Sequence, residues 1–412
     1  MARTGSSLPR GIDWIPVDVA LANLRATMPV LDETERVVVD DATERVPAND
    51  LLAARDNPPG SNAAVDGYGF VHQGGGGRRN LVRGSSVPGA PYAGVIGDGQ
   101  AVRILTGARI PPGVDTVVME ENTRVAHGVL TMTDCPDPGA NIRIAGEDFR
   151  YGDTVFGKGK RLGINDLATL AATGMQEIDV IRRPRIGVLS TGDELIEARF
   201  DTDSYDTVDM NRPVLLAMIR QWGFEARDLG RIRDDAASLR QVLGSVAGNL
   251  DAVLTTGGAS ASEQDHVSAL LKAEGSHHLW RIAMKPGRPL VMAHWQGMPI
   301  LGLPGNPVAA FVCALIFAYP ALCHLAGETW PVPVPYRVPA AFEKSKRPGR
   351  REYLRARLTK GGAAEIYPSE GSGLTTGLAW SEGLVELGDA AMNIRPGDPV
   401  CYLPYGSFRL GT

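Results

Sequence analysis

Between residues 185 and 325 the sequence alternates short apolar runs with amphipathic segments, and this alternation constrains the fold more than any other feature. The runs predicted as strands are 186–189, 251–254, 290–293 and 300–303, and the segments predicted as helices are 212–221, 266–274 and 308–325. Strands that alternate with helices predict a parallel, doubly wound sheet. We therefore expect a multidomain α/β chain whose largest part is a doubly wound, mostly parallel α/β sheet.

The flanking sequence predicts β-rich parts on both sides of that sheet. An amphipathic helix is expected over 16–31, and short β-rich runs separated by Gly and Pro fill 67–143. Three alternating prolines over 331–335 indicate a stiff linker, and the β-like runs beyond it predict a small all-β domain at the C-terminus. Gly74–Gly77, followed by two arginines, lacks the G-K-[ST] ending of a phosphate loop and is interpreted as a hairpin tip.

Composition excludes several classes of protein. The 43% of hydrophobic residues can supply a core to each domain, while a net charge of −5 and 6% of aromatic residues argue against a nucleic-acid-binding protein. Four cysteines without a C-x-x-C pair predict reduced thiols in a cytoplasmic protein, and the polar N-terminus predicts no secretory signal. The apolar run 308–327 is interrupted by Pro320, so we expect a buried helix rather than a membrane span.

Ligands of an open parallel sheet bind beyond the carboxyl ends of its strands, where three loops rich in Gly, Ser or Pro are expected here. These loops cover residues 190–195, 257–265 and 304–307. In the last loop Asn306 is predicted as an N-cap and Pro307 as the first helical residue. This arrangement would leave N–H groups free to face the crevice and would favour a phosphate.

A basic turn and a set of carboxylates complete the predicted crevice. Lys285 and Arg288 bracket a Pro-Gly bend, so both cations can project from one loop toward an anion. The carboxylates Asp193, Glu194, Asp234 and Asp265 can hold Mg²⁺, which prefers one or two carboxylates together with substrate phosphates. Anion donors and metal ligands in one crevice predict a phosphorylated or nucleotide substrate.

Each of these features has an ordinary structural alternative. Gly257 and Gly258 can form a simple turn, the Lys285–Arg288 loop can be solvated, and 304–307 can be a plain strand–helix connection. Asp265 can cap the helix that begins at 266 instead of binding a metal. Their joint occurrence at three strand ends favours the functional interpretation, and the absence of G-x-G-x-x-G argues against a dinucleotide fold.

At these residues the sequence resembles the molybdopterin molybdenumtransferase family, which includes MoeA and the C-terminal domain of gephyrin. Within the predicted sheet domain the resemblance is carried by the motifs at 191–195, 257–265, 284–289 and 303–308, and by the Asp-Asp motif at 233–235. Outside it, the matching motifs lie at 65–68, 105–120, 146–148 and 371–373. The resemblance covers nearly the whole chain from about residue 12.

The resemblance implies an activity: Mg²⁺-dependent insertion of molybdate into adenylylated molybdopterin, with release of AMP and the molybdenum cofactor. It also implies a cytoplasmic homodimer whose active site is shared, so that Asp66, Thr106 and Asp148 act on the partner's crevice. Contact with other proteins of molybdenum-cofactor synthesis is expected, whereas nucleic-acid and membrane partners are not.

The resemblance assigns roles to individual residues and divides the chain. The expected catalytic residues are Asp66, Asp148, Glu194, Asp234 and Asp265, and the expected metal ligands are Asp193, Asp234 and Asp265. Binding of the cofactor substrate is expected from Thr106, Thr191, Gly192, Gly257, Gly258, Ser260, Arg281, Lys285, Arg288, Pro304, Gly305, Asn306 and Ser372. The expected parts are a linker domain (13–50 and 149–182), an inserted β-rich subdomain (51–148), an α/β molybdopterin-binding domain (183–330) and a C-terminal β-domain (331–412).

Two other functions remain open at this point. One is the adenylyltransferase reaction that precedes molybdate insertion, and the other is a non-catalytic paralogue that binds the cofactor or a partner protein. Ser262 stands where the family usually has Gly, and this departure supports the second alternative. The sequence does not distinguish molybdate from tungstate, because both are tetrahedral oxyanions of nearly equal size.

Overall fold

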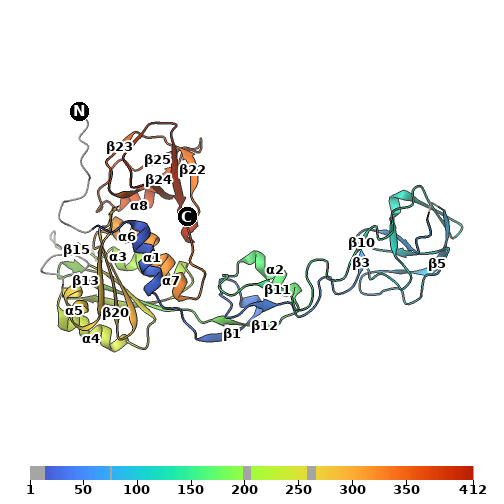
Figure 1. The fold of residues 1–412 in the computed structure, drawn as a ribbon, viewed down its shortest axis with the longest axis horizontal. Helices are drawn as coiled ribbons and strands as arrows, with labels where there is room; N and C mark the ends of the chain where they lie inside the picture. Colours follow the sequence, from blue (N-terminus) through green and yellow to red (C-terminus); the bar gives the residue numbers. More distant parts are fainter. Residues whose placement is uncertain (1–13, 75–76, 198–205, 258–265, 412) are drawn as a thin grey trace. The chain divides into compact units, whose positions relative to one another are not determined.

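The computed structural model describes residues 14–74, 77–197, 206–257 and 266–411. The chain divides into two compact units, one formed by Met1–Glu35 with Ile181–Thr412 and the other by Arg36–Val180. The larger unit contains the predicted α/β sheet and a C-terminal β-sheet, and the smaller unit is built mainly of short strands (Figure 1). The predicted multidomain α/β architecture is confirmed.

A six-stranded sheet forms the centre of the larger unit. Its strand order is β16 (Glu225–Ile232), β13 (Arg185–Thr191), β17 (Ala252–Thr256), β21 (Met298–Leu303), β20 (Pro289–Trp295) and β18 (Ser276–Arg281). The first four strands are parallel, whereas β20 runs antiparallel to both of its neighbours. The expected mostly parallel sheet is therefore confirmed, with the antiparallel part at this edge. Gln296 and Gly297 both have positive φ and join β20 to β21 in a two-residue hairpin, which requires antiparallel strands.

Helices cover both faces of this sheet. Alternate residues of each strand point to opposite faces, so each face has its own layer of buried side chains. Val188, Leu254 and Leu301 pack with α1 (Val17–Thr27) and α3 (Asn211–Gln221) on one face. Leu189, Val253 and Ile300 pack with α4 (Ala236–Val246) and α5 (His266–Glu274) on the other face. Both core layers are almost fully excluded from solvent, as the doubly wound pattern predicts.

The long apolar run is a buried core helix, as expected. It comprises α6 (Pro307–Cys313), a π-helical turn (Ala314–Ala318) and α7 (Tyr319–Leu325), and 89% of its most apolar window is buried inside the protein. Pro320 has no N–H to donate within the helix, and the wider π turn directly before α7 accommodates the proline ring.

A second sheet follows at the C-terminal end of the chain. Its order is β19 (Met284–Lys285), β24 (Arg351–Leu358), β26 (Gly383–Leu387), β28 (Pro399–Pro404) and β22 (Tyr336–Pro339), while β25 (Ala364–Ile366) also pairs with β24. The edge strand β19 comes from the basic turn of the α/β region and lies parallel to β24, with Lys285 opposite Glu352. The short pair β23 (Lys344–Lys346) and β27 (Met392–Ile394) and the helix α8 (Thr376–Trp380) complete this part.

The smaller unit contains a six-stranded sheet of its own. The order is β7 (Thr116–Met119), β4 (Gly67–Phe70), β6 (Gln100–Ile104), β5 (Arg78–Ser86), β9 (Val129–Met132) and β8 (Thr123–Ala126). Because β6 separates β4 from β5, the glycine-rich segment between them is a crossover and the expected hairpin is wrong. The rest of the unit holds α2 (Ile164–Ala172) and the pairs β3 (Asn62–Ala63) with β10 (Ile142–Arg143) and β2 (Leu51–Leu52) with β11 (Thr154–Phe156).

Candidate active site

A crevice of about 970 Å³, including the solvent at its mouth, lies where β13, β17 and β21 end. Five of the predicted binding or catalytic residues line it, namely Thr191, Glu194, Gly257, Gly305 and Asn306. They come from three loops that are far apart in the sequence and follow three adjacent parallel strands. The expected meeting of these loops at one edge of the sheet is confirmed.

Gly257 allows the β17 loop to approach the end of β13 closely. Its φ is +84°, and a Cβ at this position would lie 2.4 Å from the carbonyl oxygen of Thr191. Gly192 has a φ of +153°, and the carboxylate of Glu194 folds back to 2.9 Å from the place of its missing Cβ. The Thr191 hydroxyl is buried and has no hydrogen-bond partner among the described residues. At this end of the crevice the wall thus presents backbone at Gly257, the Thr191 hydroxyl and the Glu194 carboxylate.

Asn211 is a functional candidate that the sequence did not single out. It is the first residue of α3, is 8% exposed and lines the crevice. Its Nδ2 donates to Thr256 Oγ1 and to the Gly305 carbonyl, both at 2.7 Å. One amide therefore connects the loops after β17 and β21. The available signal was its place directly before a predicted helix, which an ordinary cap would also explain.

The start of α6 differs from the prediction in one respect. Asn306 is the N-cap and Pro307 occupies the first turn, as expected. However, the Val308 N–H donates to the Ser372 carbonyl at 3.0 Å, so it is not free to face a ligand. Ser372 belongs to the loop between β25 and α8, and Gly373 of the same loop lines the crevice. This contact brings Ser372 to the site through its backbone.

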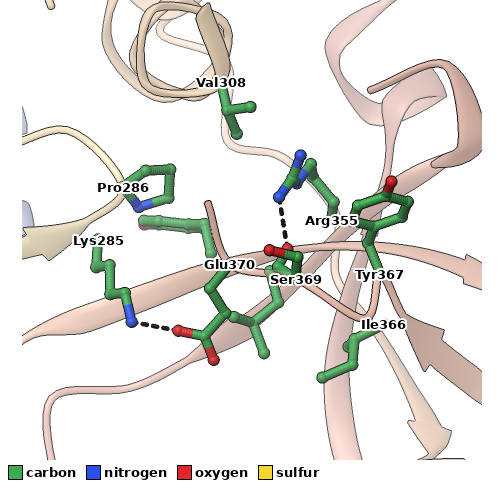
Figure 2. A pocket seen from close by; sticks show the side chains of 10 residues that line it. Lys285, Pro286, Val308, Arg355, Ile366, Tyr367, Ser369 and Glu370 are labelled. Carbon is green, nitrogen blue, oxygen red and sulfur yellow. Dashed lines mark hydrogen bonds and ion pairs between the residues drawn. The ribbon is translucent and has the colours of Figure 1, made fainter. Parts of the chain in front are cut away.

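Arg355, a second residue that sequence reasoning missed, holds that loop in place. Its guanidinium donates to the carbonyl of Ser369 at 2.6 Å (Figure 2), and also to the carbonyls of Gly371 (3.1 Å) and Leu374 (2.5 Å). Arg355 is 5% exposed, and its guanidinium lies over the ring of Tyr367 at 4.8 Å. Burial lowers the pKa of Arg355. The loop backbone is therefore fixed by one buried side chain of β24.

The basic turn lies beside the crevice and is held against α6. Gly287 has a φ of +85°, and a Cβ there would meet Cys313 Sγ at 2.5 Å and Pro304 Cγ at 3.6 Å. Lys285 Nζ pairs with the carboxylate of Glu370, which the same loop supplies (Figure 2). Arg288 is exposed, and Arg281 is half-buried at the end of β18. The structure thus brings Lys285 next to the Ser369–Leu374 loop.

The charges around Lys285 form a continuous group. Glu370 also pairs with Lys344, and Lys344 lies 3.2 Å from the buried carboxylate of Glu352. Burial alone would raise the pKa of Glu370, but the ammonium groups of Lys285 and Lys344 outweigh it and hold that pKa below its ordinary value. Burial, and then the positive charge of Arg288, lowers the pKa of Arg350.

The structure describes only two of the three predicted metal ligands. Asp193 is 61% exposed and pairs with Arg233 at 3.3 Å, and Asp234 lies half-buried just after β16. Gly258, Ser260, Ser262 and Asp265 lie outside the described residues. Within the described ranges no three His, Cys, Asp or Glu side chains cluster as a metal site. The oxygen donors of Asp193 and Asp234 still suit Mg²⁺, because this ion takes one or two protein carboxylates and completes its shell with phosphate and water.

Two of the predicted residues of the smaller unit contact each other. Asp66 Oδ1 accepts hydrogen bonds from the Thr106 N–H and hydroxyl, both at 2.7 Å, and these bonds lower the pKa of Asp66. Asp148 accepts a bond of 2.8 Å from the Asn57 amide. Both arrangements also occur as ordinary turn stabilisation. The functional roles of Asp66, Thr106 and Asp148 stay predictions.

Comparison with known families gives three consecutive matches along the chain. Residues 15–174 match the MoeA N-terminal region (domain I and II), residues 187–324 a probable molybdopterin binding domain, and residues 337–405 the MoeA C-terminal region (domain IV). The second match contains β17, β21, α6 and most of β13, whose ends form the crevice. The third contains β24 and the loop that Arg355 holds.

Known proteins match the chain over nearly its whole length. A molybdopterin molybdenumtransferase of Haemophilus influenzae is 31% identical over 95% of this chain and 98% of its own. A protein of the same name from Staphylococcus aureus is 30% identical over 94% of both chains. Among solved structures, the molybdopterin biosynthesis MoeA protein of Pyrococcus horikoshii matches with a TM-score of 0.82, at 26% identity over 95% of this chain and 100% of that one.

Proposed function

The chain belongs to the MoeA family of molybdopterin molybdenumtransferases, and from this membership we propose that it inserts molybdate into adenylylated molybdopterin with release of AMP. The observation that carries the proposal is the crevice itself. Glycine and asparagine loops from three parallel strands meet there beside a lysine and arginine turn. Such a site suits a ligand that carries a nucleotide phosphate together with an oxyanion.

The loops after β13, β17 and β21 would hold the nucleotide part of the substrate. Gly257 and Gly305 leave space for a phosphate to approach the backbone, and Asn211 fixes the two loops relative to each other. Thr191 offers a buried hydroxyl that can donate to an anion. We assign Gly192, Gly258, Ser260, Pro304 and Asn306 to the same part of the substrate.

The basic turn would hold the incoming molybdate. Lys285 and Arg288 lie on the two sides of the turn at Gly287, and a charge-assisted contact from either one would orient a tetrahedral dianion. Arg281 and Ser372 are assigned to the same region, because β18 leads into this turn and Ser372 is carried by the loop that meets Lys285. Arg355 would act as a positioning residue for that loop.

Mg²⁺ is proposed as the cofactor, held by Asp193, Asp234 and Asp265 together with substrate oxygens. When bound, it supplies positive charge against the phosphate that is cleaved. Glu194 lines the crevice and would receive or donate protons there. Asp265→Asn tests the assignment, since AMP release at the wild-type rate with saturating Mg²⁺ would make Asp265 a helix cap instead.

We also propose a cytoplasmic homodimer in which Asp66, Thr106 and Asp148 serve the crevice of the partner subunit. This proposal follows from the family, and the ionised Asp66 held by Thr106 is compatible with a role at a charged ligand. Contact with other proteins of molybdenum-cofactor synthesis belongs to the same proposal.

The deciding experiment mixes purified protein with adenylylated molybdopterin, molybdate and Mg²⁺ and measures released AMP. Release that depends on both molybdate and Mg²⁺ is expected. Formation of adenylylated molybdopterin from ATP, without molybdate-dependent AMP release, would identify the adenylyltransferase instead. Tight binding of the substrate without turnover would identify a non-catalytic paralogue.

A further inference from the structure

Lys344 contacts the same carboxylate that neutralises Lys285. Glu370 meets Lys285 Nζ through Oε2 (Figure 2) and Lys344 Nζ through Oε1, so two ammonium groups share one carboxylate. An anion that binds Lys285 competes with Glu370 for that ammonium, whatever charge the anion carries. The cost of displacing Glu370 depends on which partner the carboxylate keeps afterwards.

The Lys344 ammonium is fixed at the place where Glu370 meets it. It lies 3.2 Å from the carboxylate of Glu352, and these two side chains are only 11% and 9% exposed. Burial alone would lower the pKa of Lys344, but the carboxylates of Glu370 and Glu352 outweigh it and hold that pKa above its ordinary value. Lys344 therefore stays charged at neutral pH and remains a partner for Glu370.

Lys285 and Lys344 differ in their access to a ligand. Lys285 and Glu370 line a small pocket, whereas Lys344 is not among the described residues that line it. Arg355 binds the carbonyls of the two residues that flank Glu370, so the backbone there is held and the 38% exposed side chain is the part that can move. Rotation of the Glu370 carboxylate away from the pocket would free Lys285 and keep the contact with Lys344.

This arrangement lowers the cost of freeing Lys285. With Lys344 in place, a carboxylate displaced from Lys285 keeps one ion pair. Without Lys344, displacement would break the remaining ion pair that the described residues offer to Glu370. Resting on the proposed function, in which Lys285 binds molybdate, we propose that Lys344 is a positioning residue of this subsite: it retains Glu370 and so leaves Lys285 available to the oxyanion.

A double-mutant cycle tests whether Lys344 acts through Glu370. Isothermal titration measures molybdate binding to the full-length wild type, Lys344→Met, Glu370→Gln and the double variant. Lys344→Met should weaken binding about fivefold, the upper range for a partly exposed ion pair, and Glu370→Gln should strengthen it by a similar factor because the competitor is gone. In the Glu370→Gln background, Lys344→Met should cost about twofold or less, because only its screened charge is then lost.

The cycle separates the proposed role from a general effect of charge or structure. Equal losses from Lys344→Met in both backgrounds would show that Lys344 acts by its own charge, and they would overturn the proposal. Unchanged affinity in Lys344→Met would also overturn it. Because Lys344→Met leaves the buried Glu352 unpaired, the same cycle in the Glu352→Gln background replaces it where the single variant does not fold.

Arg357→Met is the control for loss of one positive charge. Arg357 belongs to the same C-terminal sheet and pairs with Glu365, outside the group formed by Lys285, Lys344 and Glu370. Its replacement should leave molybdate affinity unchanged. A loss equal to that of Lys344→Met would overturn the proposal.

Kinetics separate this inference from the proposed function. During AMP release, Lys344→Met should raise KM for molybdate and leave kcat near the wild-type value, because Lys344 acts on binding through Glu370. AMP release without coupling between Lys344 and Glu370 would leave the proposed function standing and overturn the inference. Coupling in molybdate binding without AMP release would do the reverse. Absence of molybdate binding in all four proteins would remove the anion from this subsite and overturn the inference.

Discussion

Replacing Arg355 by Met should release the loop that carries Ser369 to Leu374. The substitution keeps the apolar stem and removes three hydrogen bonds from a buried, charged donor to backbone carbonyls. Such bonds contribute about 1.5–3 kcal/mol each, but the three share one guanidinium and are not additive. We expect a loss of about 3–5 kcal/mol in local stability, as when one partner of a buried charged interaction is removed.

Hydrogen exchange is the suitable assay, because a multidomain chain does not unfold in one step. The amides of Leu374 and Val308 donate within this region, so peptides that cover residues 306–313 and 369–378 report on it. A loss of about 3 kcal/mol corresponds to exchange about a hundredfold faster, and AMP release should fall with it.

Arg357→Met provides the control for this prediction. Arg357 lies two residues further along β24, is 41% exposed and makes a surface ion pair with Glu365. Surface pairs of this kind contribute about 0–1 kcal/mol, so exchange in the loop should change little. If Arg355→Met and Arg357→Met gave the same exchange rates, Arg355 would not be holding the loop and its assignment as a positioning residue would be wrong.

Three further predictions follow from the site. Gly257→Ala should destabilise the α/β part by about 2 kcal/mol or more, because a Cβ would lie 2.4 Å from the Thr191 carbonyl in addition to the strain of positive φ. Gly248→Ala, with φ +79° and no atom within 4 Å of the added Cβ, should show the φ strain alone, and equal unfolding midpoints for the two variants would contradict the steric argument. Asn211→Ala should cost about 1–3 kcal/mol in denaturant unfolding and lower kcat/KM for AMP release, and wild-type kinetics would remove Asn211 from the site. Light scattering should give about twice the 43.9 kDa of one chain, and a monomer at working concentration would exclude the shared site.

The sequence predicted the parts of the fold that depend on local periodicity and on strand ends. Alternation of apolar runs and amphipathic segments located β13, β17, β21 and the helices α1, α3, α5 and α6–α7 within a few residues, but not α4. Because parallel strands present their carboxyl ends at one edge, the same pattern placed Thr191, Gly257 and Asn306 in a common crevice. The hairpin at Gln296 and Gly297 was not predictable in this way, because Gln-Gly is not one of the dipeptides typical of a two-residue hairpin turn.

Contacts between residues far apart in the chain could not be predicted from the sequence. Arg355 is separated from the carbonyls it binds by 14 to 19 residues, and Lys285 by 85 residues from Glu370. No local propensity encodes such contacts, because they depend on β19 joining the edge of a sheet formed by the C-terminal part of the chain. The motifs therefore identified several of the residues that line the crevice. Only the tertiary structure showed that the Glu370 carboxylate pairs with Lys285 and that the buried Arg355 holds the loop to which Glu370 belongs. Both contacts depend on packing between segments that lie far apart in the sequence.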